Sequence, residues 1–377
     1  MVDFASLKSA VKPKDRTDQY VILAGMYALG AHVTPVTATQ IRELLKLHLG
    51  AKTPTNIPGS LRAYTAYASP VHEGPPIQWS LTSAGVQQLG TLSGLTLSIA
   101  VDANSFQCDV GIVCALEFPE LAAVLRAFGG KSAWKEVGDP RYTHVYRETK
   151  TPTADGQTLR IIATTWTSMG LTAAAIATTQ LVHQFHPRLI AMIGIAAGTR
   201  SGDKQYGDIL VADPSVDYNS GKVVVENGIR GFQPDPYPIG LVPRLRSVLQ
   251  RYREPHELFE QIRRRWSGIV PTKPNRLHLG PVGAADQVIE DPERVLEIRT
   301  HWRKLIGVEM ETYGVYRAVQ ESPEPKPRFV SFKAVCDFAA EKTDSWQEYA
   351  AFMAAEFAGE FFRTEWANLW PKNGVLK

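Results

Sequence analysis

The fold is decided by two neighbouring stretches of the sequence, KLIGVEMETYGVYRAVQ at residues 304–320 and RFVSFKAVCDF at residues 328–338. The first stretch is an apolar run over 304–310 that passes directly into a helical pattern over 311–320. The second is an apolar run that ends close to an acidic residue, Asp337. A strand, a helix and a second strand in this order form the unit from which helix-covered sheets are built. The sequence therefore predicts an α/β domain with acidic side chains near its strand ends.

The same alternation continues on both sides of these stretches. Further apolar runs predict strands at 109–115, 158–165, 188–196, 207–213 and 277–286, and helical patterns occupy 171–185, 291–301 and 345–370. Near-continuous apolar strands separated by helices indicate a sheet that helices cover on both faces. We expect a three-layer α/β/α sandwich over residues 108–377.

The first hundred residues have a different pattern. Three helices are predicted at 18–30, 39–49 and 57–67, and the string IQWSLTSAGVQQL at 77–89 resembles the closing strand and helix of winged helix-turn-helix domains. We expect a small winged-helix-like domain over 1–95 and a linker over 96–107.

This N-terminal domain is poorly suited to binding DNA. The candidate recognition helix, TNIPGSLRAYTAY, offers only Arg62 as a cation, with Lys52 shortly before it. Because contacts from several Lys and Arg to phosphates dominate DNA affinity, the composition favours a protein partner or self-association instead.

The composition is that of an ordinary globular protein. The 377 residues are 44% hydrophobic and 21% charged, and the formal net charge of +3 is too small to argue for a nucleic acid or a membrane. The three cysteines form no zinc-like spacing and the nine histidines no cluster, so no metal and no cofactor are predicted. Without a signal peptide or a long apolar span, the expected location is the cytoplasm.

Five short strings occur in an order that resembles a known family. They are GIVCALEFPELAAV (111–124), MIGIAAG (192–198), YGDILVAD (206–213), GVEMETYGVYRAV (307–319) and FKAVCDFAAEKTD (332–344). The order is similar to the nucleoside phosphorylase/nucleosidase superfamily, especially methylthioadenosine/S-adenosylhomocysteine nucleosidases and the related domains of bacterial and fungal immune effectors. The resemblance spans about residues 108–370, and it implies a central mixed sheet and a homo-oligomer.

The resemblance implies three catalytic residues for cleaving an N-glycosidic bond. Such a reaction needs an acid for the departing base, a carboxylate near the ribose and an activated nucleophile. Asp337 takes the position of the acid, where apolar flanks would raise its pKa, although Cys336 stands where a Ser often precedes it. Glu311 takes the position of the ribose ligand, with Met310 against the sugar. Glu309 would assist there, although two Glu at a helix start also suit its dipole.

Two residues compete for the role of activating water. The loop after the first strand is one residue longer than the commonest pattern, so counting from the strand selects Glu117 and matching the following helix selects Glu120. We prefer Glu120, because a helix fixes the direction of a side chain more firmly than a loop does.

The remaining expected contacts concern the nucleophile and the base. Phosphorylases usually place Ser or Thr after the first glycine of Gly194-Ile195-Ala196, whereas Ile195 cannot donate a hydrogen bond from its side chain. We therefore expect hydrolysis by water. Val288 and Ile289 match the segment that lines the base, with Asp286 structural, and Phe338 follows the acid as a further substrate contact.

Cations between the strands at 207–213 and 277–286 suggest a phosphorylated substrate. Lys222 ends a turn, and seven arginines lie in an expected helical pair at 241–266: Arg244, Arg246, Arg251, Arg253, Arg263, Arg264 and Arg265. They either pair with Glu254, Glu257 and Glu260 on a solvated face or bind a polyphosphate.

The sequence-based hypothesis is thus hydrolysis of an adenine nucleotide, ATP above all, or of a nucleoside, by an antiviral-defence effector. The alternatives are a purine nucleoside phosphorylase of salvage and a nucleoside-sensing transcription regulator.

Overall fold

The computed structural model divides the chain into two compact units, Met1–Ser105 and Phe106–Lys377. It describes residues 3–12, 16–31, 35–70, 76–93, 95, 106–199, 204–254, 256–338 and 344–370. Of the expected linker at 96–107, residues 96–105 lie outside this described part. The assignment of residues 1–95 and 108–377 to separate domains stays a prediction.

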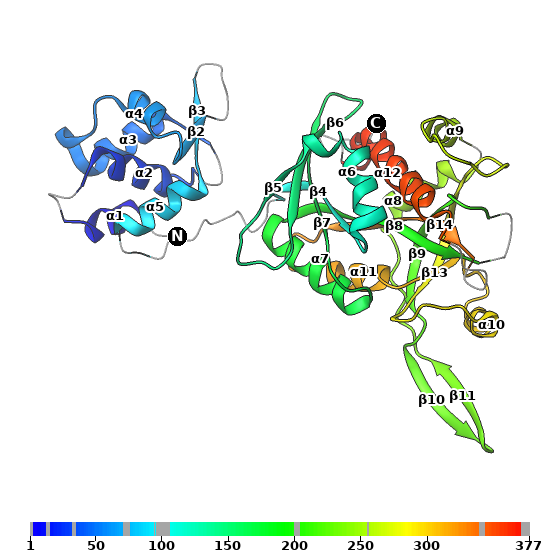
Figure 1. The fold of residues 1–377 in the computed structure, drawn as a ribbon. Coiled ribbons are helices and arrows are strands. Elements are labelled where there is room, and N and C mark those ends of the chain that lie inside the picture. The colour runs from blue at the N-terminus through cyan, green and yellow to red at the C-terminus, as the bar shows by residue number, and fades with distance from the viewer. Residues whose placement is uncertain are drawn as a thin grey trace. The chain divides into compact units, whose positions relative to one another are not determined.

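The first unit consists of helices around a small antiparallel sheet (Figure 1). Its elements are α1 (Phe4–Ala10), α2 (Asp18–Ala28), β1 (Val36–Thr37), α3 (Ala38–Leu49), α4 (Ile57–Ala63), β2 (Ala68–Pro70), β3 (Gln78–Leu81) and α5 (Ser83–Ser93). The strand order is β1-β3-β2. Thr37 and Gln40 form a capping box that starts α3, because each side chain accepts from the other residue's backbone N–H. The three predicted helices and the closing strand and helix are present; the winged-helix assignment stays a prediction.

The second unit contains a mixed sheet of nine strands. In chain order these are β4 (Cys108–Cys114), β5 (Lys135–Val137), β6 (Tyr146–Pro152), β7 (Thr158–Thr165), β8 (Pro187–Gly198), β9 (Ile209–Asp217), β12 (Leu277–Ala284), β13 (Gly307–Glu309) and β14 (Arg328–Asp337). The spatial order is β13-β12-β9-β14-β8-β4-β7-β6-β5. The central strands are almost wholly buried, as their continuous apolar sequences require. The edge strand β5 and its neighbour β6 were not predicted from the sequence.

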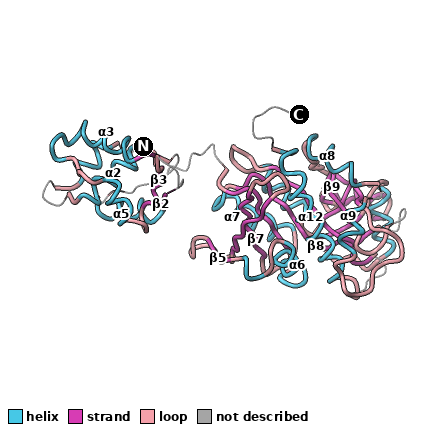
Figure 2. Tube along the Cα trace, turned by 90° about the horizontal axis from the view of Figure 1, so that it is seen from above, coloured by secondary structure: helices cyan, strands magenta, loops and turns pink. Residues whose placement is uncertain are grey.

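Helices cover this sheet on both faces (Figure 2). They are α6 (Ala122–Ala127), α7 (Leu171–Phe185), α8 (Pro243–Leu249), α9 (Glu257–Arg263), α10 (Pro292–His301), α11 (Thr312–Gln320) and α12 (Gln347–Leu369). Helices α7 and α11 pack together, whereas α12 packs against α6, α8 and α9. The expected three-layer α/β/α arrangement is confirmed. Figure 1 also shows a hairpin, β10 (Gly221–Glu226) and β11 (Ile229–Pro234), that extends from this unit.

The sheet closes on itself at one end, which the sequence did not predict. Strand β13 pairs in parallel with β12 and also pairs antiparallel with the end of β8. Strand β8 is long enough to pair with β4 along its first half and with β13 at its last residues. The ends of β8, β13 and β14 therefore meet at one place in the fold. No helix in the described part of the chain is long and apolar enough to cross a membrane.

Candidate active site

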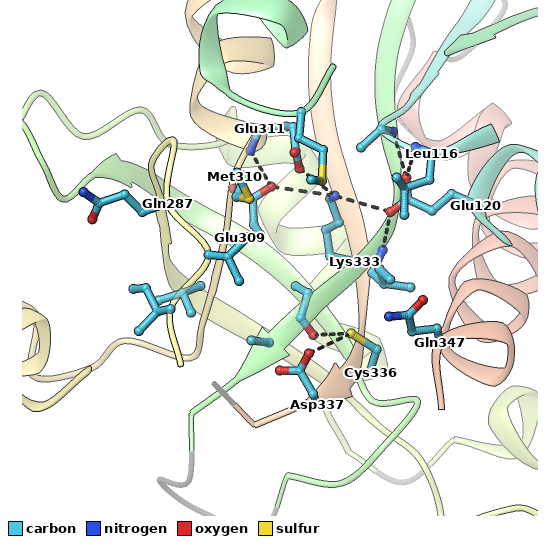
Figure 3. A pocket seen from close by; sticks show the side chains of 18 residues that line it. Leu116, Glu120, Gln287, Glu309, Met310, Glu311, Lys333, Cys336, Asp337 and Gln347 are labelled. Carbon is cyan, nitrogen blue, oxygen red and sulfur yellow. Dashed lines mark hydrogen bonds and ion pairs between the residues drawn. The ribbon is translucent and has the colours of Figure 1, made fainter. Parts of the chain in front are cut away.

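One residue of β8 joins the two stretches that carry the predicted acid and ribose ligand. Ala197 is the register partner of Asp337 on β14 and of Val308 on β13. Glu309 ends β13, and Glu311 directly precedes α11. The acidic residues that the sequence separates by about 25 positions thus lie at the rim of one cavity of about 290 Å³ (Figure 3).

Most of the sequence-predicted site residues line this cavity. They are Glu120, Ile195, Ala196, Val288, Ile289, Glu309, Met310, Glu311 and Asp337. Gly194 lies directly behind Glu120. Phe338 is buried against Tyr206, with ring centroids 5.4 Å apart, and does not line the cavity. Lys222 is exposed on β10 and does not line it either.

Glu120 is held in the cavity by three backbone N–H groups. The turn Glu117–Leu121 contains an extended residue, Phe118, that bends the chain back toward the end of β4. Oε2 of Glu120 accepts from the N–H of Ala115 at 2.7 Å and of Leu116 at 2.9 Å, and Oε1 accepts from the N–H of Ile195 at 2.8 Å. A carboxylate bound by backbone amides in this way has a fixed direction.

Glu117 lies outside this cavity. Its side chain is 60% exposed and forms an ion pair with Arg147 at 3.3 Å. Glu120, by contrast, is 2% exposed. Of the two candidates, only Glu120 faces the same space as Glu311 and Asp337.

Glu309 and Glu311 have different surroundings although they are two residues apart. Glu309 accepts from the N–H of Glu311 at 3.0 Å and of Thr312 at 2.9 Å, so it caps the start of α11. The Glu311 carboxylate accepts from the Gly170 N–H at 3.4 Å. Burial raises the pKa of Glu309 to about 7, although the charge of Lys333 opposes the effect and that of Glu311 adds to it.

Sequence reasoning missed Lys333, which lies among three carboxylates. Its Nζ is 3.4 Å from Glu311 Oε2, 3.7 Å from Glu309 Oε2 and 3.7 Å from Glu120 Oε1, and its side chain is 2% exposed. Burial alone would lower the pKa of Lys333, but the three carboxylates together raise it above its ordinary value. The signal was a lysine inside the apolar strand FVSFKAVCD, because a lysine is almost never fully buried without a partner.

The charge of Lys333 also affects the pKa of Glu120, the carboxylate that accepts from the N–H of Ile195 on β8. Burial raises the pKa of Glu120, and the charge of Lys333 lowers it again in part. The cluster therefore contains three carboxylates and one ammonium group in an enclosed space. Because an unpaired charge in such a place is strongly unfavourable, each of these side chains depends on the others.

Asp337 lies near the end of β14, on the far side of Lys333 from Glu311 in Figure 3. It is 6% exposed, and the thiol of Cys336 lies 3.5 Å from its Oδ2 and also 3.5 Å from the carbonyl oxygen of Ala196. Burial raises the pKa of the Cys336 thiol, so Cys336 is a neutral neighbour of the acid.

The wall beside Asp337 is aliphatic. Ile289 is 9% exposed and Val288 is 52% exposed, and the described residues that line the cavity include no aromatic ring. Asp286 accepts from the Leu171 N–H at 2.6 Å, which agrees with its expected structural role.

The arginines of 241–266 are directed elsewhere and do not line the cavity. Arg265 pairs with Glu356 at 2.7 Å and with Glu360 at 2.8 Å, Arg246 with Asp213, and Arg251 with Glu365. Most of these partners lie on α12 rather than on the arginines' own helices, and only Glu260 of the expected partners is used, by Arg263 at 3.7 Å. No group of His, Cys, Asp and Glu among the described residues could hold a metal ion.

Comparison with known proteins relates the second unit to one superfamily. Residues 109–361 match the profile of the Phosphorylase superfamily. An uncharacterized protein, y4jS, of Sinorhizobium fredii is 32% identical over 67% of this chain and 60% of its own length. The ATP nucleosidase Cap17 of Escherichia coli is 26% identical over 66% of this chain and 50% of its own length. The chain thus spans little more than half of these relatives.

A solved structure has the same fold as the second unit. It is the 5′-methylthioadenosine/S-adenosylhomocysteine nucleosidase of Helicobacter pylori, with a TM-score of 0.50 and 20% identity. The alignment covers 67% of this chain and 97% of that chain. The likeness therefore extends over nearly all of that chain and concerns the fold alone.

Proposed function

The chain belongs to the phosphorylase superfamily, and on this premise we propose that it hydrolyses the N-glycosidic bond of an adenine nucleotide, with ATP as the preferred substrate. The observation that carries the proposal is the arrangement of Glu120, Glu311 and Asp337 around one cavity of about 290 Å³. This volume is at the lower end of the range for small-molecule sites, roughly 300–1,000 Å³. Three acidic groups provide the proton acceptor, the sugar ligand and the proton donor that the reaction needs.

In the proposed reaction the adenine lies against Asp337 and Ile289, and the ribose lies between Glu311 and Glu120. Asp337 donates a proton to N7, and the C1′–N9 bond breaks with its electron pair moving to the base. Water bonds to C1′ through its oxygen and loses a proton to Glu120. The products are adenine and a ribose 5′-phosphate derivative with a free 1-hydroxyl.

Glu311 and Lys333 stabilise charges in the reaction and transfer no proton. The carboxylate of Glu311 accepts from the sugar hydroxyls and stabilises the positive charge that develops on the ribose. Lys333 favours the ionised form of Glu120, because its charge opposes in part the rise that burial causes in the pKa of Glu120. A general base must be ionised before it can accept a proton from water.

Water is favoured over phosphate as the nucleophile by the backbone of β8. The N–H of Ile195 already donates to Glu120 at 2.8 Å, and the side chain of Ile195 has no donor. A phosphate at this place would meet a carboxylate instead of a hydroxyl and an amide. Two like charges in an enclosed site repel each other strongly.

The nucleotide is favoured over the nucleoside by one relative. Cap17 is named an ATP nucleosidase, and its similarity covers the unit that contains the cavity. Removal of the base from ATP would exhaust the energy carrier of a cell, which suits an antiviral-defence effector that is silent until triggered. In this proposal the first unit receives the trigger by binding a protein partner or a second copy of the chain. Strong, salt-sensitive binding of the full chain to DNA in a gel shift would contradict that role.

A panel of substrates tests the proposed reaction. ATP, AMP, adenosine and methylthioadenosine are incubated with the full chain, with and without inorganic phosphate, and the released base and sugar are separated by chromatography. We expect ATP to be cleaved fastest and at a rate independent of phosphate. Faster cleavage of methylthioadenosine would contradict the nucleotide preference, and ribose 1-phosphate would identify a phosphorylase. Binding of a nucleoside without cleavage would favour a sensing regulator.

A further inference from the structure

A second cavity of about 710 Å³ adjoins the candidate active site. The two cavities share three wall residues, Ala115, Leu116 and Met169. Of these, Leu116 lies at the end of the first cavity that is remote from Asp337, as Figure 3 shows. If the base lies against Asp337, any group that the sugar carries beyond its ring leaves toward this second cavity.

The lining of the second cavity differs in character from that of the first. Besides the shared residues its polar side chains are Arg147, His144, Trp166, one carboxylate, Glu117, which is paired with Arg147, and the hydroxyl residues Thr143, Thr165, Thr167 and Ser168. Hydroxyl groups with an arginine form the usual set of donors for phosphate oxygens, since the guanidinium binds two oxygens at once. The first cavity, by contrast, presents carboxylates, one lysine and aliphatic side chains.

Two donors of this second cavity lack a partner among the described residues. The indole N–H of Trp166, a residue that is 6% exposed, and the hydroxyl of Thr165 make no hydrogen bond. Buried donors in folded proteins are nearly always satisfied, and the exceptions often mark a site for a ligand or an ion. Thr165 is the last residue of β7, Trp166 is the next residue, and both line the second cavity.

Arg147 is available to an incoming anion. Its side chain is 23% exposed, and the one ion pair that it forms with the described residues is the 3.3 Å contact with Glu117, whose side chain is 60% exposed. Exposed pairs of this kind are weak and are readily exchanged for a stronger partner. Beyond Arg147 a further cavity of about 430 Å³ carries Lys131 and Lys135.

We propose that the cavity beside Leu116 and Met169 is the subsite for the phosphate chain of the nucleotide, with Arg147 as its principal cation. The subsite binds a linear polyphosphate ester, and it also has room for a monophosphate or a diphosphate. It replaces the exposed Lys222 and the arginines of α8 and α9, which do not line either cavity. This inference rests on the proposed cleavage of an adenine nucleotide.

Variants of the full chain test the subsite through a ratio of rates. The quantity measured is kcat/KM for ATP divided by kcat/KM for adenosine. Loss of a charge-assisted contact in Arg147→Ala should lower this ratio roughly 10- to 100-fold, mainly through the KM for ATP. Arg147→Lys keeps the charge and should restore part of the ratio. Glu117→Gln removes the competing carboxylate and should raise it.

The matched control is Arg264→Ala, which removes an exposed arginine of the same charge from outside both cavities. Its ratio should equal that of the wild type, and thermal melting should confirm that every variant is folded. The subsite is contradicted if Arg147→Ala leaves the ratio unchanged, whether kcat/KM falls equally for both substrates or for neither. If the wild type cleaves neither substrate, the proposed function fails, and calorimetry then decides the subsite alone. Binding of ATP that Arg147→Ala does not weaken would contradict it there too.

Discussion

A β-carbon on Gly194 would lie 2.0 Å from Oε1 of Glu120, closer than any real contact allows. The bare backbone of Gly194 is therefore what lets the Glu120 carboxylate lie against the end of β8. The next residue, Ile195, donates its N–H to that same oxygen at 2.8 Å. The missing side chain of Gly194 and the N–H of Ile195 together fix the position of the Glu120 carboxylate.

Gly194→Ala should therefore impair the reaction without unfolding the protein. The added methyl group displaces the Glu120 side chain from its three amide donors, because the far end of a side chain moves more easily than a strand. We expect kcat to fall by roughly 10²-fold or more, as for loss of a general base. Gly359→Ala is the control, since a β-carbon there meets no atom closer than 3.8 Å. Wild-type kcat in Gly194→Ala would show that Glu120 is not needed where it lies.

Asp337→Asn and Glu311→Gln should each abolish base release while the melting temperature stays near that of the wild type. Asparagine cannot donate the carboxyl proton to the base, and glutamine cannot stabilise a positive sugar. Each loss should be roughly 10²- to 10⁴-fold in kcat. Chromatography of released adenine is the measurement, and near wild-type turnover by either folded variant would refute the assigned role.

Glu120→Ala should be inactive, whereas Glu117→Ala should keep most of the wild-type activity toward adenosine. The reason is that Glu120 is buried in the cavity and Glu117 is largely exposed outside it. With the wild type and with Glu117→Ala the sugar product should carry a free 1-hydroxyl, and added phosphate should not change the rate. The opposite order of the two variants would transfer the water-activating role to Glu117.

The pH dependence of kcat should reveal the charge of Lys333. Glu120 accepts a proton only when ionised, so activity is absent at low pH and rises as the pH passes through its pKa. Burial raises that pKa above 4.5, and Lys333 lowers it in part. Lys333→Met should move the rise in activity to higher pH, whereas Lys333→Arg should leave it near its original position.

Lys333→Met also leaves three buried carboxylates without a cation, which should cost roughly 3–5 kcal/mol of stability. Thermal melting measures this loss, and Lys333→Arg should recover most of it. An unchanged pH profile in a folded Lys333→Met protein would mean that the lysine stabilises the fold without affecting Glu120.

The sequence predicted the strands and helices that bear the site, because continuous apolar runs and acidic strand ends are local features. It also named the residues at the rim of the cavity. The choice between Glu120 and Glu117 could only be argued, since it depends on the irregular turn at Glu117–Leu121. Closure of the sheet was not predicted, because it depends on a pairing between β8 and β13 that are over a hundred residues apart.

Lys333 and Arg147 were missed for different reasons. Lys333 is conspicuous inside an apolar strand, but its three partners come from two other parts of the chain, Glu120 from one and Glu309 and Glu311 from the other. Arg147 lies on β6, a strand that the sequence did not indicate. Lys222 and the arginines of residues 241–266 were selected by charge alone, and charge does not tell whether a side chain faces a cavity or a neighbouring helix. The partners on α12 decided that question.

The shared register partner of Asp337 and Val308 has an evolutionary consequence. Because Ala197 lies between β14 and β13, strand spacing alone fixes how far apart the groups acting on base and sugar can be. Insertions in the surrounding loops leave that spacing unchanged. A lineage can therefore exchange the walls of the neighbouring cavity, and with them the compounds it accepts, while its bond-breaking machinery is inherited intact.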